Sequence, residues 1–199
     1  MDVKAVIFDA DGVLLTSGFF SEELERSYGL PTSATLPFFT SALEPCLVGQ
    51  ADLKQELAPF LKQWSWPGSV DDFIERWFSH GASVDPRIVA TIAELRRRGL
   101  RCYLATNQEP YRMAYIREQM GFEQIFDDFF FSGGIGCKKT DSRFYQVVMQ
   151  ATDLRGAEIL FWDDTFENIV AAREQGWHAE HYRSFEEFEQ TLATYLQNA

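Results

Sequence analysis

The chain has 199 residues, which is enough for one full domain or for one domain with an insertion. Its 30 acidic and 18 basic residues give a net charge of −12, which argues against non-specific binding to nucleic acid or to an anionic membrane surface. No apolar run approaches the roughly 20 residues that a membrane-spanning helix needs. The three cysteines are widely spaced and suggest no disulfide framework, and the apolar run at residue 3 leaves no room for a signal peptide, so we expect a cytoplasmic protein.

Residues 3–14 read Val-Lys-Ala-Val-Ile-Phe-Asp-Ala-Asp-Gly-Val-Leu. An apolar run that ends at a turn signal predicts a strand buried on both faces, as in a parallel sheet covered by helices. Ligands of such sheets bind beyond the carboxyl ends of the strands, which is where this pattern places Asp9 and Asp11, with Gly12 allowing the turn. Two neighbouring carboxylates repel each other unless a cation compensates. The pair is therefore either a capped turn or part of a site for a hard cation.

Residues 17–83 contain no convincing buried strand. Apolar residues recur at helical spacing over 53–64, and Asp71 opens a further helix after a Pro-Gly turn. We therefore predict an all-helical insertion of roughly 65 residues, which is too long for a connecting loop. Its many aromatic side chains are expected to form mostly its own core, with Phe19 and Phe20 as candidates for lining its inner surface.

From residue 84 onward, predicted helices alternate with strands. The strands are expected at 100–105, 129–131, 159–162 and 177–182. Helices between successive strands require parallel pairing with right-handed crossovers. The predicted fold class is thus α/β, a doubly wound parallel five-stranded sheet with a small all-helical cap domain. We expect residues 1–16 and 84–199 to form the core and residues 17–83 to form the cap.

Polar and charged side chains follow four of these segments at the same edge of the sheet. They are Asp9 and Asp11 after the first strand, Thr106 and Asn107 after the second, Lys138 and Lys139 in a glycine-rich loop after the third, and Asp163 and Asp164 after the fourth. Carboxylates can hold Mg²⁺ or attack phosphorus, while a hydroxyl, backbone amides and an ammonium group can hold phosphoryl oxygens. The set is what metal-assisted phosphoryl transfer requires.

At these four places the whole chain resembles the haloacid dehalogenase superfamily, in the branch with a small helical cap after the first strand. The matching motifs are residues 8–14, residues 104–107, residues 136–141 and residues 161–168. The resemblance implies that Asp9 is the nucleophile that forms an aspartyl-phosphate and is also a metal ligand. It further implies that Asp11 is the general acid and then the general base, and that its backbone carbonyl contacts the metal.

The resemblance also implies the binding residues. Thr106 would hold the phosphoryl group through its hydroxyl, helped by the amide of Asn107, and Lys139 would neutralise charge between nucleophile and phosphate. Asp164 would bind Mg²⁺ directly, and Asp163 would assist directly or through water. The third motif departs from the family pattern at Thr140, where proline is usual, so Lys138 remains an alternative to Lys139.

An Asp at position 11 points to phosphate esters, since family members that release halide or cleave phosphonates lack it. We therefore expect a Mg²⁺-dependent phosphatase that acts on a small phosphorylated metabolite, as a monomer or homodimer, without nucleic-acid or membrane partners. A sugar phosphomutase of the same superfamily is one alternative. A catalytically idle member that binds phosphate or a protein is the other.

Overall fold

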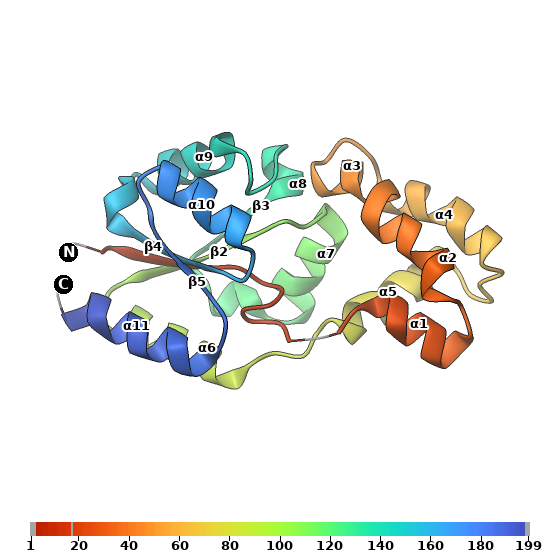
Figure 1. The fold of residues 1–199 in the computed structure, drawn as a ribbon, viewed down its shortest axis with the longest axis horizontal. Coiled ribbons are helices and arrows are strands. Elements are labelled where there is room, and N and C mark those ends of the chain that lie inside the picture. Colours follow the sequence, from red (N-terminus) through yellow and green to blue (C-terminus); the bar gives the residue numbers. More distant parts are fainter. Residues whose placement is uncertain (1–2, 17, 198–199) are drawn as a thin grey trace.

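The computed structural model of the chain describes residues 3–16 and 18–197. Five parallel strands form one sheet in the order β3-β2-β1-β4-β5 (Figure 1). The strands are Ala5–Phe8 (β1), Arg101–Thr106 (β2), Asp128–Phe131 (β3), Ile159–Asp163 (β4) and His178–His181 (β5). The chain winds outward on one side of β1 and then returns to its other side, so the strand order reverses at the β1/β4 pair, where open sheets bind ligands. The predicted fold class is confirmed.

Helices cover both faces of this sheet because β1 is apolar on both faces. Val6 and Phe8 join one buried apolar cluster, and Ala5 and Ile7 join the other. The helices of the first face are Pro86–Arg97 (α6), Pro110–Ala114 (α7) and Phe185–Gln197 (α11), and those of the second are Ser142–Thr152 (α9) and Phe166–Glu174 (α10). Short helical segments complete the core at Tyr115–Gln119 (η2), Phe122–Gln124 (η3), Ser132–Ile135 (α8) and Gly156–Glu158 (η4).

The segment between β1 and α6 was predicted to be helical. In its described part, residues 18–83, all regular elements are helices. It contains Phe20–Tyr28 (α1), Thr32–Pro37 (α2), the π-helical turn Phe38–Ala42 (η1), Glu44–Leu47 (α3), Leu53–Gln63 (α4) and Val70–His80 (α5). Its aromatic side chains pack on one another around Phe73, which contacts Phe20, Trp64 and Trp66. Phe19 is the exception, with 78% of its surface exposed.

The helical insertion lies beyond the strand ends, on the side of the sheet to which β1 leads (Figure 1). Two chain segments connect the insertion to the core, and they run antiparallel to each other. Backbone hydrogen bonds from the Thr16 amide to the Ser83 carbonyl and from the Asp85 amide to the Leu14 carbonyl hold these two segments together. The predicted boundary at Ser17 lies outside the described residues, and the division into core and cap domains stays a prediction. None of the helices in the described part of the chain is both long and apolar enough to cross a membrane.

The structure differs from the sequence prediction at the loop after the third strand. Residues 132–135 form the short helix α8 where a glycine-rich loop was expected. The backbone amide of Gly136 bonds the carbonyl of Ser132, and Gly136 ends the turn with φ of 86°. Its glycine allows this left-handed conformation, and the chain then turns toward Lys138 and Lys139.

Candidate active site

The first strand delivers Asp9 to the centre of the sheet edge. The Asp9 amide still bonds the Trp162 carbonyl of β4 at 2.9 Å, so the pairing of the two strands fixes the backbone there. The Asp9 carboxylate accepts a hydrogen bond from the Ala10 amide at 2.7 Å, and the side chain is buried. This nucleophile candidate is therefore rigidly placed.

Glycine at position 12 lets two strand ends approach each other closely. Gly12 has φ of 79°, and a Cβ atom added to it would overlap the carboxylate of Asp164. Any side chain at this position would therefore strain the turn and displace Asp164. The turn thus brings the end of β4 against the end of β1.

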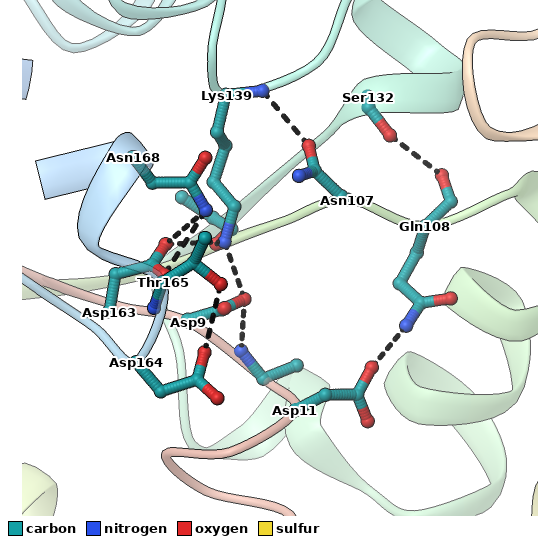
Figure 2. A network of polar contacts seen from close by, with 12 residues as sticks. Asp9, Asp11, Asn107, Gln108, Ser132, Lys139, Asp163, Asp164, Thr165 and Asn168 are labelled. Atoms are coloured by element: carbon teal, nitrogen blue, oxygen red, sulfur yellow. Dashed lines mark hydrogen bonds and ion pairs between the residues drawn. The ribbon is translucent and has the colours of Figure 1, made fainter. Parts of the chain in front are cut away.

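Lys139 joins the carboxylates of β1 and β4. Its Nζ lies 2.7 Å from Oδ1 of Asp9, 2.7 Å from Oδ2 of Asp163 and 3.2 Å from the Ala105 carbonyl (Figure 2). The side chain is buried, which favours a neutral amine, but the two carboxylates raise the pKa of Lys139, so it stays charged. Lys138 instead pairs with Glu44 of α3. The lysine that reaches Asp9 is the one selected from the sequence spacing.

Both carboxylate oxygens of Asp163 have hydrogen-bond partners. Both of its oxygens lie 3.1 Å from Nδ2 of Asn168, and Oδ1 also accepts the Thr165 amide at 2.8 Å. These bonds tie the end of β4 to the first turn of α10. Asp163 therefore orients Lys139 as well as standing beside Asp9, a role that the sequence analysis did not assign to it.

Three carboxylates could share one cation. Asp9, Asp163 and Asp164 each offer an oxygen, and these atoms lie within 4.8 Å of one another. Hard carboxylate oxygens are the ligands that Mg²⁺ prefers, so the donor set fits this ion. The Asp11 carboxylate lies outside this group, and the predicted contact of Asp11 with the metal is through its backbone carbonyl.

The electrostatics of this cluster favour added positive charge. Burial raises the pKa of Asp9 to about 8, although Lys139 opposes the shift, and Asp163 reinforces it. Desolvation and the charge of Asp163 also raise the pKa of Asp164. A single lysine does not balance three carboxylates, and a bound divalent cation would stabilise all three in their charged forms.

The Asp11 side chain points away from this cluster. Figure 2 shows it turned toward Gln108, whose Nε2 donates a hydrogen bond to Oδ2 of Asp11. The guanidinium of Arg112 lies 4.0 Å from Oδ1. The side chain retains 52% exposure, but it lies between the core and the helical insertion, and this desolvation raises the pKa of Asp11 against the opposing charges of Arg112 and Lys139. A raised pKa suits a general acid.

Thr106 and Asn107 occupy the end of the neighbouring strand. Thr106 is buried in the last position of β2, which pairs with β1 and β3. Oδ1 of Asn107 accepts the backbone amide of Lys139 at 2.9 Å, so this side chain holds the lysine loop in place. The Asn107 side chain thus has a structural partner, and the contact with phosphate, which stays a prediction, would be made by its backbone amide.

Sequence reasoning missed the partners of Asp11. Gln108 and Arg112 follow the second motif, and the sequence patterns assigned a catalytic role to neither. Both η-nitrogens of Arg112 donate to carbonyls of the insertion, those of Phe78 and Gly81, at 2.6 Å. Glu109 caps α7, and burial raises its pKa to about 7. The position directly after a motif at a strand end is the one signal that could have marked Gln108.

A doubly wound sheet with this cluster at its switch point defines a class of α/β enzyme with a carboxylate and lysine centre. The chain matches the family model of the haloacid dehalogenase-like hydrolases over residues 3–176, and it therefore belongs to this family.

Relatives agree with this assignment. The chain is 29% identical over 180 residues to the sesquiterpene phosphatase astK of Aspergillus oryzae. This aligned region covers 87% of this chain and 86% of that protein. It is 26% identical over 184 residues to a phosphorylated carbohydrates phosphatase of Thermotoga maritima, and here the aligned region covers 87% of this chain and 82% of that protein. A HAD family enzyme of Bacteroides thetaiotaomicron, solved as a magnesium complex, has the same fold, with a TM-score of 0.82 and 16% identity over 96% of this chain and 99% of that one. These findings confirm the expected enzyme class, a phosphoric monoester hydrolase.

Proposed function

We propose that the protein is a Mg²⁺-dependent phosphatase that hydrolyses a small phosphomonoester through an aspartyl-phosphate at Asp9. One observation carries the proposal. The buried ammonium of Lys139 contacts Asp9 and Asp163 at 2.7 Å, and Asp164 stands beside them in a group of oxygens that fits a divalent cation. The reduced cysteines and the acidic composition support action in the cytoplasm on a small metabolite.

In the first step, an Asp9 oxygen attacks phosphorus, and the bond from phosphorus to the ester oxygen breaks. Asp11 gives its proton to the departing alkoxide. Lys139, the Thr106 hydroxyl and the Asn107 amide hold the phosphoryl oxygens. In the second step, Asp11 takes a proton from water, the water oxygen attacks phosphorus, and inorganic phosphate leaves as Asp9 is regenerated. When bound, Mg²⁺ supplies positive charge that offsets the repulsion between carboxylate and phosphate.

Removal of divalent cations tests the metal in this proposal. We expect treatment with EDTA to reduce hydrolysis of p-nitrophenyl phosphate by about 100-fold or more, because Asp9 and the phosphate would then repel each other with only Lys139 between them. Addition of millimolar Mg²⁺ should restore the rate, and an Asp164→Asn variant should need a higher Mg²⁺ concentration for the same effect. Unchanged turnover after chelation would contradict the proposed metal requirement.

Substitution of Asp11 tests the proton transfer. We expect Asp11→Asn to slow hydrolysis of an alkyl phosphate by roughly 10²–10⁴-fold, because asparagine cannot protonate a poor leaving group. The first turnover of p-nitrophenyl phosphate should fall much less, since p-nitrophenolate leaves without a proton. Rapid-mixing measurements of the first turnover separate this step from the later attack by water. Equal losses for both substrates would remove Asp11 from the role of general acid.

The phosphatases to which this chain is similar differ in substrate. One relative is named for a sesquiterpene and another for phosphorylated carbohydrates, and these two kinds of substrate differ in polarity. Selection between them depends on the part of this chain that would surround the leaving group.

A further inference from the structure

We infer that the alcohol released from the substrate is apolar, an aliphatic or aromatic alcohol rather than a sugar or a group that carries a second phosphate. The inference rests on the proposed phosphatase function, because it concerns the group that Asp11 would protonate.

A cavity of about 410 Å³ lies between the strand ends and the helical insertion. This volume falls within the range of roughly 300–1,000 Å³ that is typical of small-molecule sites. Asp11, Asn107 and Gln108 line its core side. The Asp11 carboxylate therefore faces the space next to the ester oxygen, and the cavity is where a leaving group would sit.

The insertion lines this cavity with large apolar side chains. They come from α1, α2, η1, α3 and α5, and include Phe20, Leu36, Phe39, Leu43, Leu47 and Trp77. Leu36 has 44% of its surface exposed although the other large side chains of the insertion are mostly buried in its core. An apolar leaving group would cover such surface and remove it from water.

The polar groups of the lining are largely bonded to the protein. Oγ1 of Thr40 donates to the Leu36 carbonyl at 2.9 Å, and Gln108 donates to Asp11. Arg112 is the only lysine or arginine among the described residues of the lining, and both of its η-nitrogens already bond backbone carbonyls.

His80 also lines the cavity, but its ring packs on Phe20 at 5.5 Å and its Nε2 atom is buried away from the open space. The hydroxyls of a sugar would lose water without equivalent partners, and each such loss weakens binding by roughly five- to 100-fold. For a second phosphate, the described lining holds only the Arg112 guanidinium, whose η-nitrogens already bond carbonyls and which lies 4.0 Å from the Asp11 carboxylate.

A set of primary phosphate esters tests this inference on the full protein with Mg²⁺. We expect kcat/KM to rise about three- to fourfold with each added methylene from ethyl through butyl to hexyl phosphate, because each added methylene is transferred from water into the apolar cavity. Hexyl phosphate and glucose 6-phosphate share a six-carbon primary alcohol and differ in their hydroxyls. We expect hexyl phosphate to be hydrolysed with a kcat/KM at least about 50-fold higher.

Two matched variants locate the selectivity. Leu36→Gln should lower the ratio of the kcat/KM values for hexyl and ethyl phosphate at least about fivefold. Val170→Gln changes a side chain of similar exposure, 40%, on α10 outside the cavity, and should leave that ratio unchanged.

The possible outcomes distinguish a failure of the apolar leaving group from a failure of the proposed phosphatase function. Asp9-dependent phosphate release with no chain-length effect, or with a preference for glucose 6-phosphate, would overturn the apolar leaving group and leave the phosphatase intact. Absence of Asp9-dependent release from every ester, p-nitrophenyl phosphate included, would overturn both.

Discussion

Replacement of Asp9 by asparagine is expected to reduce turnover of p-nitrophenyl phosphate by at least roughly 10⁴-fold, because the amide cannot form the aspartyl-phosphate. Asparagine keeps the Oδ1 atom that accepts hydrogen bonds from Ala10 and Lys139, so the geometry of the strand end should persist. Phosphate release measured in saturating Mg²⁺ gives the loss of activity, and mass spectrometry of acid-quenched protein should show the phosphorylated species only for the original chain.

The same substitution should not weaken the fold. Burial and the neighbouring Asp163 raise the pKa of Asp9, so its charged form is unfavourable in the absence of a cation. We therefore expect the metal-free Asp9→Asn protein to melt at the same temperature as the original chain or a few degrees higher. Asp153→Asn is the matched control, since Asp153 is an exposed residue in the left-handed conformation that asparagine tolerates. Retained turnover in Asp9→Asn would remove Asp9 as nucleophile.

Much of the fold follows from local sequence signals. The apolar run before Asp9 and the run before Asp163 predict strands with both faces buried, and parallel pairing then brings their carboxyl ends to one edge. The helical character of the insertion follows from the periodicity of its apolar residues, and α5 begins at Val70, one residue before the predicted start at Asp71, with Ser69 as its cap. Residues 30–47 gave no such pattern, because their short elements include the π-helical turn η1 and depend on packing against the rest of the insertion.

Part of the candidate site could likewise be predicted from the sequence, and part of it could not. The spacing of the third motif selected Lys139, and the structure brings its Nζ to Asp9 and Asp163. The environment of Asp11 could not be derived, because Gln108 and Arg112 reach it only once α7 begins and the insertion docks. Glu44 pairs with Lys138 from 94 residues away, a contact that no local pattern records. The roles of these residues in catalysis stay predictions that the variants described above address.

Replacement of Lys139 by methionine is expected to have the largest effect on stability. Methionine fills a similar volume, but it leaves Asp9 and Asp163 buried without their cation. Removal of one partner from a buried ion pair destabilises by about 3–5 kcal/mol. A chain of this size loses roughly 2–4 °C of melting temperature per kcal/mol, so the metal-free variant should melt about 6–20 °C lower. Turnover should be lost as well, since no ammonium would remain beside the nucleophile.

The pH dependence of this loss identifies its cause. A buried carboxylate with a raised pKa destabilises the fold above its unfolded pKa of about 4, and the effect disappears as the pH falls and the group takes up a proton. The difference in melting temperature between the original chain and Lys139→Met should therefore shrink as the pH is lowered from 8 toward 4. A second substitution, Asp163→Asn, should recover part of the stability of Lys139→Met, because it removes one of the unpaired charges.

Lys138→Met provides the neighbouring control. Lys138 pairs with Glu44 near the surface, and such exposed pairs contribute only about 0–1 kcal/mol, so this variant should melt within a few degrees of the original chain. Differential scanning calorimetry of the three variants at several pH values makes the comparison. If Lys138→Met and Lys139→Met lost equal stability, or if the loss in Lys139→Met did not change with pH, the unpaired carboxylates would not be its origin, and Lys139 would not be the group that balances the charge around Asp9.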